Sequence, residues 1–296
     1  METLSSEFRN IIKQVVLISK SSTVITDKNV YQPGDADIIP LVDRIVEALL
    51  LPGSGISGME HIINLYEKAV SGKSCLLLVE HYSNLDLPIL SCLLRKEPEP
   101  GKKIADSLIA IAGMKLNEES PTVAAFTGAY TRIVIYPSRS LRQLDPEKDR
   151  AEKLRSISIN RAAMKALRDV KIQGKIVLVF PSGTRYRPWD PGTKKGVREI
   201  DSYIKSFDHF CPVALNGEVL HVRQGDMMDD YVSRDLLRIT AGPIRSCREF
   251  REAARSKAEA AGLPDKKQAA VDAIMEMLEE MHIAAEEERK TLMKHA

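Results

Sequence analysis

Proton transfer is the first chemistry that the sequence suggests, because His81 and Asp86 stand close together in His-Tyr-Ser-Asn-Leu-Asp. His81 follows the apolar run 75–80, which predicts a buried strand, and Asp86 stands at the start of an expected helix. Histidine titrates near neutral pH, and an aspartate bonded to one ring nitrogen leaves the other free to take a proton. A histidine at a strand end can also be structural, so this pair alone does not decide the function.

A second polar segment, Pro-Ser-Gly-Thr-Arg-Tyr-Arg-Pro at 181–188, also follows a predicted buried strand. Arg185 and Arg187 are two residues apart, so an extended backbone would point both to the same side. Arginine makes paired hydrogen bonds to phosphate oxygens, and the two side chains could therefore form an anion site. The alternative is a solvated basic loop.

A third segment, 131–142, places Arg139 and Arg142 after the predicted strand 133–136. These arginines could add positive charge to the same site if the strand ends lie at one edge of a sheet. The alternative is a surface loop.

The rest of the sequence predicts the elements that would hold these loops. Apolar runs predict strands at 75–80, 108–112, 133–136, 176–180, 211–215 and 236–240. Helical patterns cover 4–19, 37–51, 58–70, 84–95, 120–128, 149–172, 248–261 and about 25 residues from Asp265. Buried runs separated by helices predict an α/β fold, a mostly parallel mixed sheet with helices on both faces. The Gly- and Ser-rich stretch 53–58 divides an expected N-terminal helical region, 1–57, from an α/β domain with C-terminal helices, 58–296.

Composition excludes several classes of protein. The formal net charge of the 296 residues is +2, with no basic arm, which argues against a nucleic-acid partner. Every apolar run is far shorter than a membrane span, so any membrane contact would be peripheral. The four cysteines form no Cys-x-x-Cys pair and are expected to be free and mostly buried, as in a reducing compartment. The first residues lack a basic segment followed by an apolar one, so we expect no secretory signal there.

Four segments in order resemble the glycerolipid acyltransferases. The His-x4-Asp box at 81–86 is followed by Gly128–Arg139, by Phe-Pro-Ser-Gly-Thr-Arg at 180–185, and by a proline box at Cys211–Leu215. Together they cover roughly residues 75–220. Any one box is a weak signal, whereas the ordered set is specific.

Ser182 favours one branch of that family. Acyltransferases of lysophosphatidate usually have glutamate there, whereas Pro-Ser-Gly-x-Arg-x-Arg-Pro is similar to the soluble, plastid-type glycerol-3-phosphate acyltransferases. Two departures leave the acceptor open. That branch has Lys and His where this chain has Arg139 and Ser140, and its first box is usually His-Gln-x-Glu-x-Asp.

The resemblance implies a reaction, the first step of phospholipid synthesis. His81, oriented by Asp86, would deprotonate the 1-hydroxyl of glycerol 3-phosphate, which would attack the thioester of acyl carrier protein or acyl-CoA. The substrate phosphate would be held by Arg139, Arg185 and Arg187. The substrate pocket would be lined by Ser182, Gly183 and Thr184. No metal or cofactor is required, and the expected location is the cytoplasm or a stroma-like compartment, with peripheral membrane contact left open.

Three other functions compete with this one. Lysophosphatidate could be the acceptor. The chain could be a non-catalytic lipid- or acyl-carrier-binding protein, although both His81 and Asp86 are present. A hydrolase with Ser182 as nucleophile would need the Gly-x-Ser-x-Gly elbow, and Ser182 stands in Pro-Ser-Gly instead.

Overall fold

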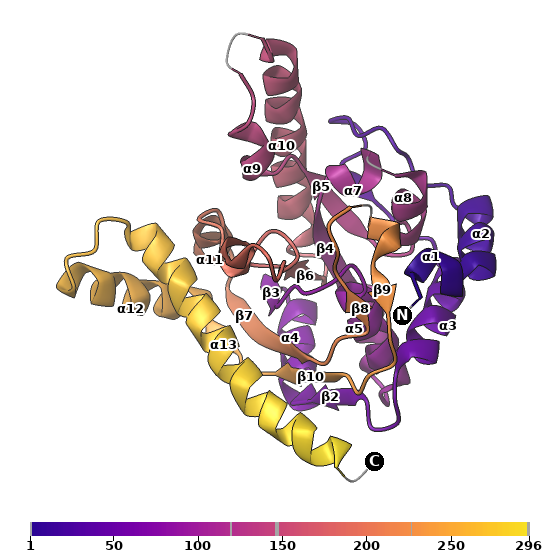
Figure 1. The fold of residues 1–296 in the computed structure, drawn as a ribbon. Helices are drawn as coiled ribbons and strands as arrows, with labels where there is room; N and C mark the ends of the chain where they lie inside the picture. Colours follow the sequence, from indigo (N-terminus) through magenta and orange to yellow (C-terminus); the bar gives the residue numbers. More distant parts are fainter. Residues whose placement is uncertain (1, 119, 146–147, 226, 295–296) are drawn as a thin grey trace.

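The protein is described here from a computed structural model that covers residues 2–118, 120–145, 148–225 and 227–294. It confirms the predicted α/β class, with a mixed sheet between two layers of helices (Figure 1). The strands of the main sheet are β1 (Tyr31–Gln32), β2 (Gly55–Ser57), β3 (Cys75–Val79), β4 (Leu108–Gly113), β5 (Arg132–Ile135), β6 (Ile176–Val179), β7 (His209–Asn216), β10 (Arg238–Ala241) and β11 (Arg245–Ser246). A separate two-stranded ribbon contains β8 (Leu220–His221) and β9 (Tyr231–Val232).

The centre of the sheet is parallel. Its order is β1-β5-β4-β6-β3-β7-β10-β2, and the five strands from β5 to β7 all run in the same direction. The carboxyl ends of these strands therefore lie at one edge, where ligands bind in open α/β sheets. The loops after β3, β5 and β6 carry the polar segments that the sequence singled out.

Helices surround this sheet. The helices of the first half are α1 (Leu4–Glu7), α2 (Arg9–Ile18), α3 (Ile39–Leu49), α4 (Met59–Val70), α5 (Asp86–Lys96), α6 (Gly101–Ser107), α7 (Lys115–Glu118) and α8 (Pro121–Thr127). Those of the second half are α9 (Ser138–Leu141), α10 (Arg150–Val170), α11 (Ile200–Ser206), α12 (Cys247–Ala260) and α13 (Lys266–Met293). No helix in the described residues is both long and apolar enough to cross a membrane.

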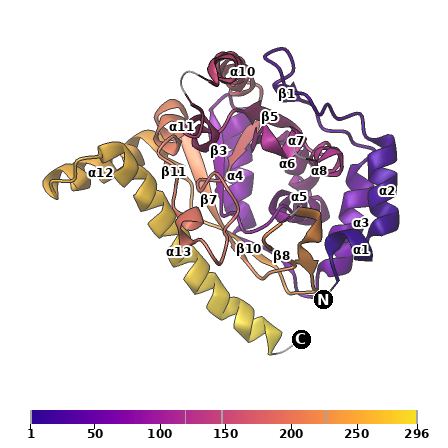
Figure 2. The same ribbon diagram turned by 45° about the horizontal axis from the view of Figure 1, so that its top comes forward.

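The side chains of β3 point alternately to the two faces of the sheet, which explains the helical layer on each face. Its five residues, Cys-Leu-Leu-Leu-Val, are all buried. Leu77 packs with α4, α5 and α6 on one face, whereas Leu76 and Leu78 pack with α10, α11 and α13 on the other. A strand that is apolar on both sides must be covered on both sides, because successive side chains point to opposite faces. Figure 2 shows the N-terminal helices α1–α3 and the C-terminal helices α12 and α13 on opposite sides of the sheet.

Two segments of the N-terminal region join the main sheet. Gly55–Ser57, within the stretch expected to separate two domains, is the edge strand β2 and runs parallel to β10. Tyr31–Gln32 forms β1, antiparallel to β5. The division at residue 57 stays a prediction, but both strands tie the first 57 residues to the same sheet.

The terminal helices agree with their amphipathic patterns in outline. The helix expected at 4–19 is interrupted at Phe8, between α1 and α2. The last helix docks on the core, with Val271, Ile274 and Leu278 fully buried. All four cysteines are free and buried, as predicted.

Candidate active site

His81 and Asp86 form the hydrogen-bonded pair that the sequence predicted. His81 leaves the end of β3, and Asp86 is the first residue of α5. The distance from His81 Nδ1 to Asp86 Oδ2 is 2.9 Å. The His81 side chain is 16% exposed and that of Asp86 6%, so the histidine can be reached from outside while the carboxylate is covered.

The Asp86 carboxylate is held by further donors from the intervening turn. Tyr82 N donates to Oδ2 at 2.7 Å, and Ser83 donates through its backbone N at 2.9 Å and its hydroxyl at 2.8 Å. An ionised carboxylate can only accept, so Nδ1 of His81 must be the donor and carries the proton. The neutral ring then has its lone pair on Nε2, for which the described residues provide no partner. This tautomer is the one required of a general base.

The loop after β6 fixes the other side of the His81 ring. Phe180 stacks on the imidazole, with ring centroids 3.9 Å apart and an interplanar angle of 15°. Tyr186 N donates to the His81 carbonyl oxygen at 2.8 Å. Because β3 and β6 are neighbouring parallel strands, the two boxes, about a hundred residues apart in sequence, meet at the sheet edge.

Ser182, Gly183 and Thr184 make the turn that redirects this loop. Gly183 N donates to the Phe180 carbonyl at 2.9 Å, and Gly183 has a φ of +65°, where a side chain is strained. The buried Ser182 hydroxyl donates to the Thr184 carbonyl at 2.7 Å. That bond is internal to the turn, and the described residues show no hydrogen bond between Ser182 and His81, so the geometry gives no support to Ser182 as a nucleophile.

Arg185 has a buried partner that the sequence analysis did not foresee. Its Nη1 lies 2.5 Å from Asp230 Oδ2, and the two side chains are 11% and 0% exposed. Asp230 also accepts from Arg223 N at 2.9 Å, and its carbonyl accepts from Leu4 N at 3.0 Å. Asp230 therefore fixes one end of the guanidinium through its carboxylate and binds the N-terminal helix α1 through its backbone carbonyl.

The other two predicted phosphate ligands lie in different settings. Arg187 is half-buried, its backbone N donates to the Thr193 hydroxyl at 2.9 Å, and its guanidinium pairs with no carboxylate in the described residues. Arg139 is exposed on α9, beyond the end of β5. Strand β5 is three positions from β3, which is roughly 14 Å at the usual strand spacing. Arg139 thus shares the edge with His81 but does not lie beside it, and its phosphate role stays a prediction.

Glu80, directly before His81, joins the site to the C-terminal helix. Its buried carboxylate accepts from the Tyr82 hydroxyl, from Leu215 N and from His282 Nδ1, each at 2.9 Å. His282 belongs to α13 and lies about two hundred residues away in sequence. The backbone on the amino side of His81 is thereby held to both β7 and α13.

A family model described as Acyltransferase matches residues 60–265, well over half of the chain. The chain belongs to the Acyltransferase family. Membership of this family supports O-acyl transfer in glycerolipid metabolism as the general activity. The matched residues include β3, β6 and both boxes. No curated protein was found to match the chain.

The sequence analysis of this Acyltransferase assigned no role at the site to four residues that contact it or its neighbours: Glu80, Phe180, Asp230 and His282. Glu80 directly precedes the first box and Phe180 is the first residue of the second, and the charged residue at the end of an apolar strand was a usable signal. Asp230 and His282 carry no local signal, because their importance comes from partners distant in the sequence.

The Glu80–His282 pair predicts a pH-dependent contribution to stability. Burial lowers the pKa of His282, but the hydrogen bond to Glu80 and its negative charge raise it more, so the pKa lies above its ordinary 6.5. The stabilisation is therefore fully present below about pH 6.5 and is lost as pH rises through the folded-state pKa. Urea unfolding of wild type and His282→Gln should show a gap in unfolding free energy that narrows toward alkaline pH.

Glu80→Gln is the matched variant, because it keeps the shape and removes the charge. Its unfolding free energy, compared with that of wild type, should show the same gap as His282→Gln, narrowing toward alkaline pH. A gap that stays constant or widens with rising pH would contradict the assigned ion pair.

Proposed function

We propose that the chain transfers a fatty acyl group from an acyl carrier protein or acyl-CoA thioester to the 1-hydroxyl of glycerol 3-phosphate. The observation that carries this proposal is the imidazole of His81, held between Asp86 and Phe180 with no partner at Nε2 among the described residues, beside the loop that contains Arg185 and Arg187. A base next to guanidinium groups suits an acceptor that has both a hydroxyl and a phosphate.

The proposed reaction moves one proton through His81 and exchanges a carbon–sulfur bond for a carbon–oxygen bond. His81 Nε2 takes the proton of the 1-hydroxyl as its oxygen attacks the thioester carbonyl. The tetrahedral intermediate collapses by breaking the carbon–sulfur bond, and the imidazolium returns the proton to the leaving thiolate. Asp86 stabilises the imidazolium in between, as the carboxylate of a catalytic triad does.

The arginines would supply position. A phosphate bound by Arg187 and by the donors of Arg185 other than Nη1 would hold the acceptor hydroxyl in front of His81, and such orientation lowers the barrier by several kcal/mol. The ion pair with Asp230 supports this role, because it fixes the Arg185 guanidinium before substrate arrives. Ser182, Gly183 and Thr184 would contribute the backbone that shapes this pocket.

The acceptor is tested directly by thiol release. Wild-type protein with acyl-CoA or acyl carrier protein thioester should release thiol when glycerol 3-phosphate is added, and mass spectrometry should find the 1-acyl product. Release with lysophosphatidate alone would replace the proposed acceptor with the second candidate. Thioester binding without release under either condition would favour the non-catalytic alternative.

The base is tested by His81→Ala and Asp86→Asn. Loss of the base should lower kcat by roughly 10²- to 10⁴-fold. Asp86→Asn keeps the shape but no longer enforces the tautomer, and should cost kcat a similar factor with little change in KM. Circular dichroism and thermal unfolding should show that both variants fold, and activity near that of wild type in either would refute the assigned roles.

Arg187→Ala is the sharper test of the phosphate site. Removing a charged hydrogen-bond donor should raise KM for glycerol 3-phosphate about 10- to 100-fold and leave KM for the thioester nearly unchanged. Arg185→Ala would confound the result, because it leaves Asp230 buried and unpaired at a cost of about 3–5 kcal/mol. Arg245→Ala is the control, because Arg245 is exposed on β11, which pairs with the amino-terminal part of β7, away from the strand ends that carry the site. Equal effects of Arg187→Ala on both substrates would contradict a phosphate role.

A further inference from the structure

Helix α10 (Arg150–Val170) has one buried face and one exposed face, and the exposed face carries both cations and large apolar side chains. One face packs on the sheet through the buried residues Ser156, Ile159, Ala163, Leu167 and Val170. At about 100° of rotation per residue, the opposite face presents positions 150, 153, 154, 157, 161, 164, 165 and 168. Every residue at these positions is exposed.

Five of the eight are cations. They are Arg150, Lys153, Arg161, Lys165 and Arg168. None has a carboxylate within ion-pair distance in the described part of the chain, whereas Arg155, off this face, pairs with Glu118 and Glu152. The whole chain has a formal charge of only +2, so this face concentrates positive charge. In the described part of the chain, two acidic residues of this segment flank the face, Asp149 directly before Arg150 and Asp169 near the end of the helix.

The other three are large apolar side chains. Leu154, Ile157 and Met164 are 61%, 56% and 58% exposed. Single exposed apolar residues need no explanation, but three on one stripe among cations mark a contact surface.

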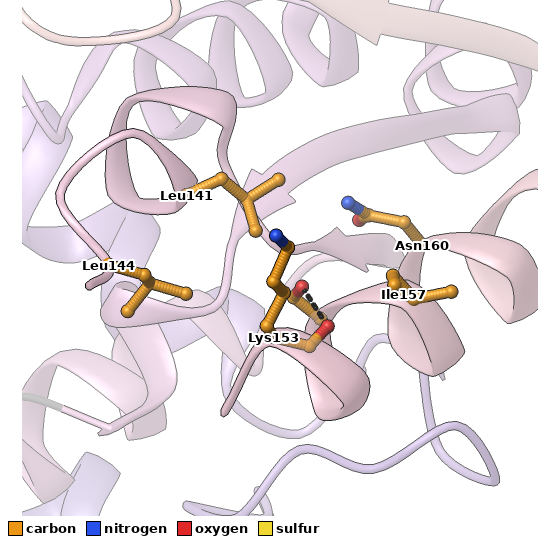
Figure 3. Close-up of a pocket in the computed structure, with 6 residues that line it drawn as sticks. Leu141, Leu144, Lys153, Ile157 and Asn160 are labelled. Carbon is orange, nitrogen blue, oxygen red and sulfur yellow. Dashed lines mark hydrogen bonds between the residues drawn. The ribbon is translucent and has the colours of Figure 1, made fainter. Parts of the chain in front are cut away.

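An open hollow of about 430 Å³ adjoins this stripe, between α9 and the first half of α10. Figure 3 shows Leu141 and Leu144 on one side, Ile157 and Asn160 on the other, and Lys153 between them. Most of its accessible lining is apolar. A hollow of this kind suits a molecule with an apolar chain and a negatively charged head.

The position of α10 connects this surface with the site. Figure 1 shows its first half rising beyond the strands, next to α9. Asn160 exchanges hydrogen bonds with the backbone of Tyr136, at 2.8 and 3.1 Å, just past the end of β5. The ten residues before Asn160 therefore extend past the edge of the sheet at which His81 lies.

We propose that the exposed face of α10 docks on a lipid surface that carries anionic headgroups. Its cations extend over about 27 Å along the helix axis. A long row of charges on one exposed helix face fits a flat, deformable layer. Lysine and arginine can bind headgroups while Leu154, Ile157 and Met164 enter the acyl boundary, as in interfacial helices. An acidic protein partner would need a surface shaped to this ridge, and it is the alternative outcome of the test. The docking does not depend on which acceptor the enzyme uses.

The test is cosedimentation of the full chain with vesicles. Vesicles of phosphatidylcholine mixed with phosphatidylglycerol should bind the protein, pure phosphatidylcholine should bind it far less, and added salt should weaken binding. Each cation near an anionic surface contributes about fivefold to partitioning, so Lys153→Gln/Arg161→Gln/Lys165→Gln should weaken binding about 100-fold. Leu154→Ser/Ile157→Ser should weaken it while leaving the charge intact.

A charge-matched control separates docking from net charge. Lys102→Gln/Lys103→Gln/Lys290→Gln removes the same charge from α6 and the end of α13, and should bind vesicles as wild type does. Thiol release from soluble acyl-CoA without vesicles should be unchanged in the α10 variants, so failure of docking and failure of the proposed reaction are distinguishable. Equal vesicle binding by wild type, the α10 variants and the control would overturn the proposal. Loss of binding to acyl carrier protein but not to vesicles would assign the face to a protein instead.

Discussion

The hydrogen bond between the buried Asp86 carboxylate and His81 Nδ1 is the interaction on which the site depends. The carboxylate stands at the first turn of α5, where backbone N–H groups and the helix dipole favour negative charge. Ser83 satisfies its remaining lone pairs. A carboxylate so held stays in place, and the histidine that donates to it has one orientation and one tautomer. The proton-accepting nitrogen is therefore Nε2, which has no hydrogen-bond partner in the described part of the chain.

The parallel pairing of β3 with β6 turns this local pair into a possible active site. The pairing brings Phe180 onto the imidazole and Tyr186 N onto the His81 carbonyl, although the two segments are far apart in sequence. Catalysis by orientation needs groups held to within a fraction of an ångström, and adjacent strands provide such rigidity. The turn at Gly183 then sends the arginines back across the edge of the sheet.

Buried charge also links the site to distant parts of the chain. Glu80 accepts from His282 of α13, and Arg185 pairs with Asp230, whose backbone binds the start of α1. A buried pair of this kind adds little net stability, but removal of one partner is costly because the other remains charged and dry. Helix α13 is thus bonded to Glu80, the residue before the proposed base. Helix α1 is linked through Asp230 to Arg185 in the loop after β6.

The sequence by itself predicted the strands β3 to β7 and β10 with most of the longer helices, the placement of three polar segments after strands, and the resemblance to the family. These features depend on local periodicity and on short motifs, which a single segment carries. It did not reveal that Gly55–Ser57 would be an edge strand, that Arg185 would be shared with Asp230, or that Glu80 would bind His282. Those contacts join residues as far as 202 positions apart, and the choice of partner depends on how the layers pack. Only the tertiary structure, which decides what each buried charge meets, could supply them.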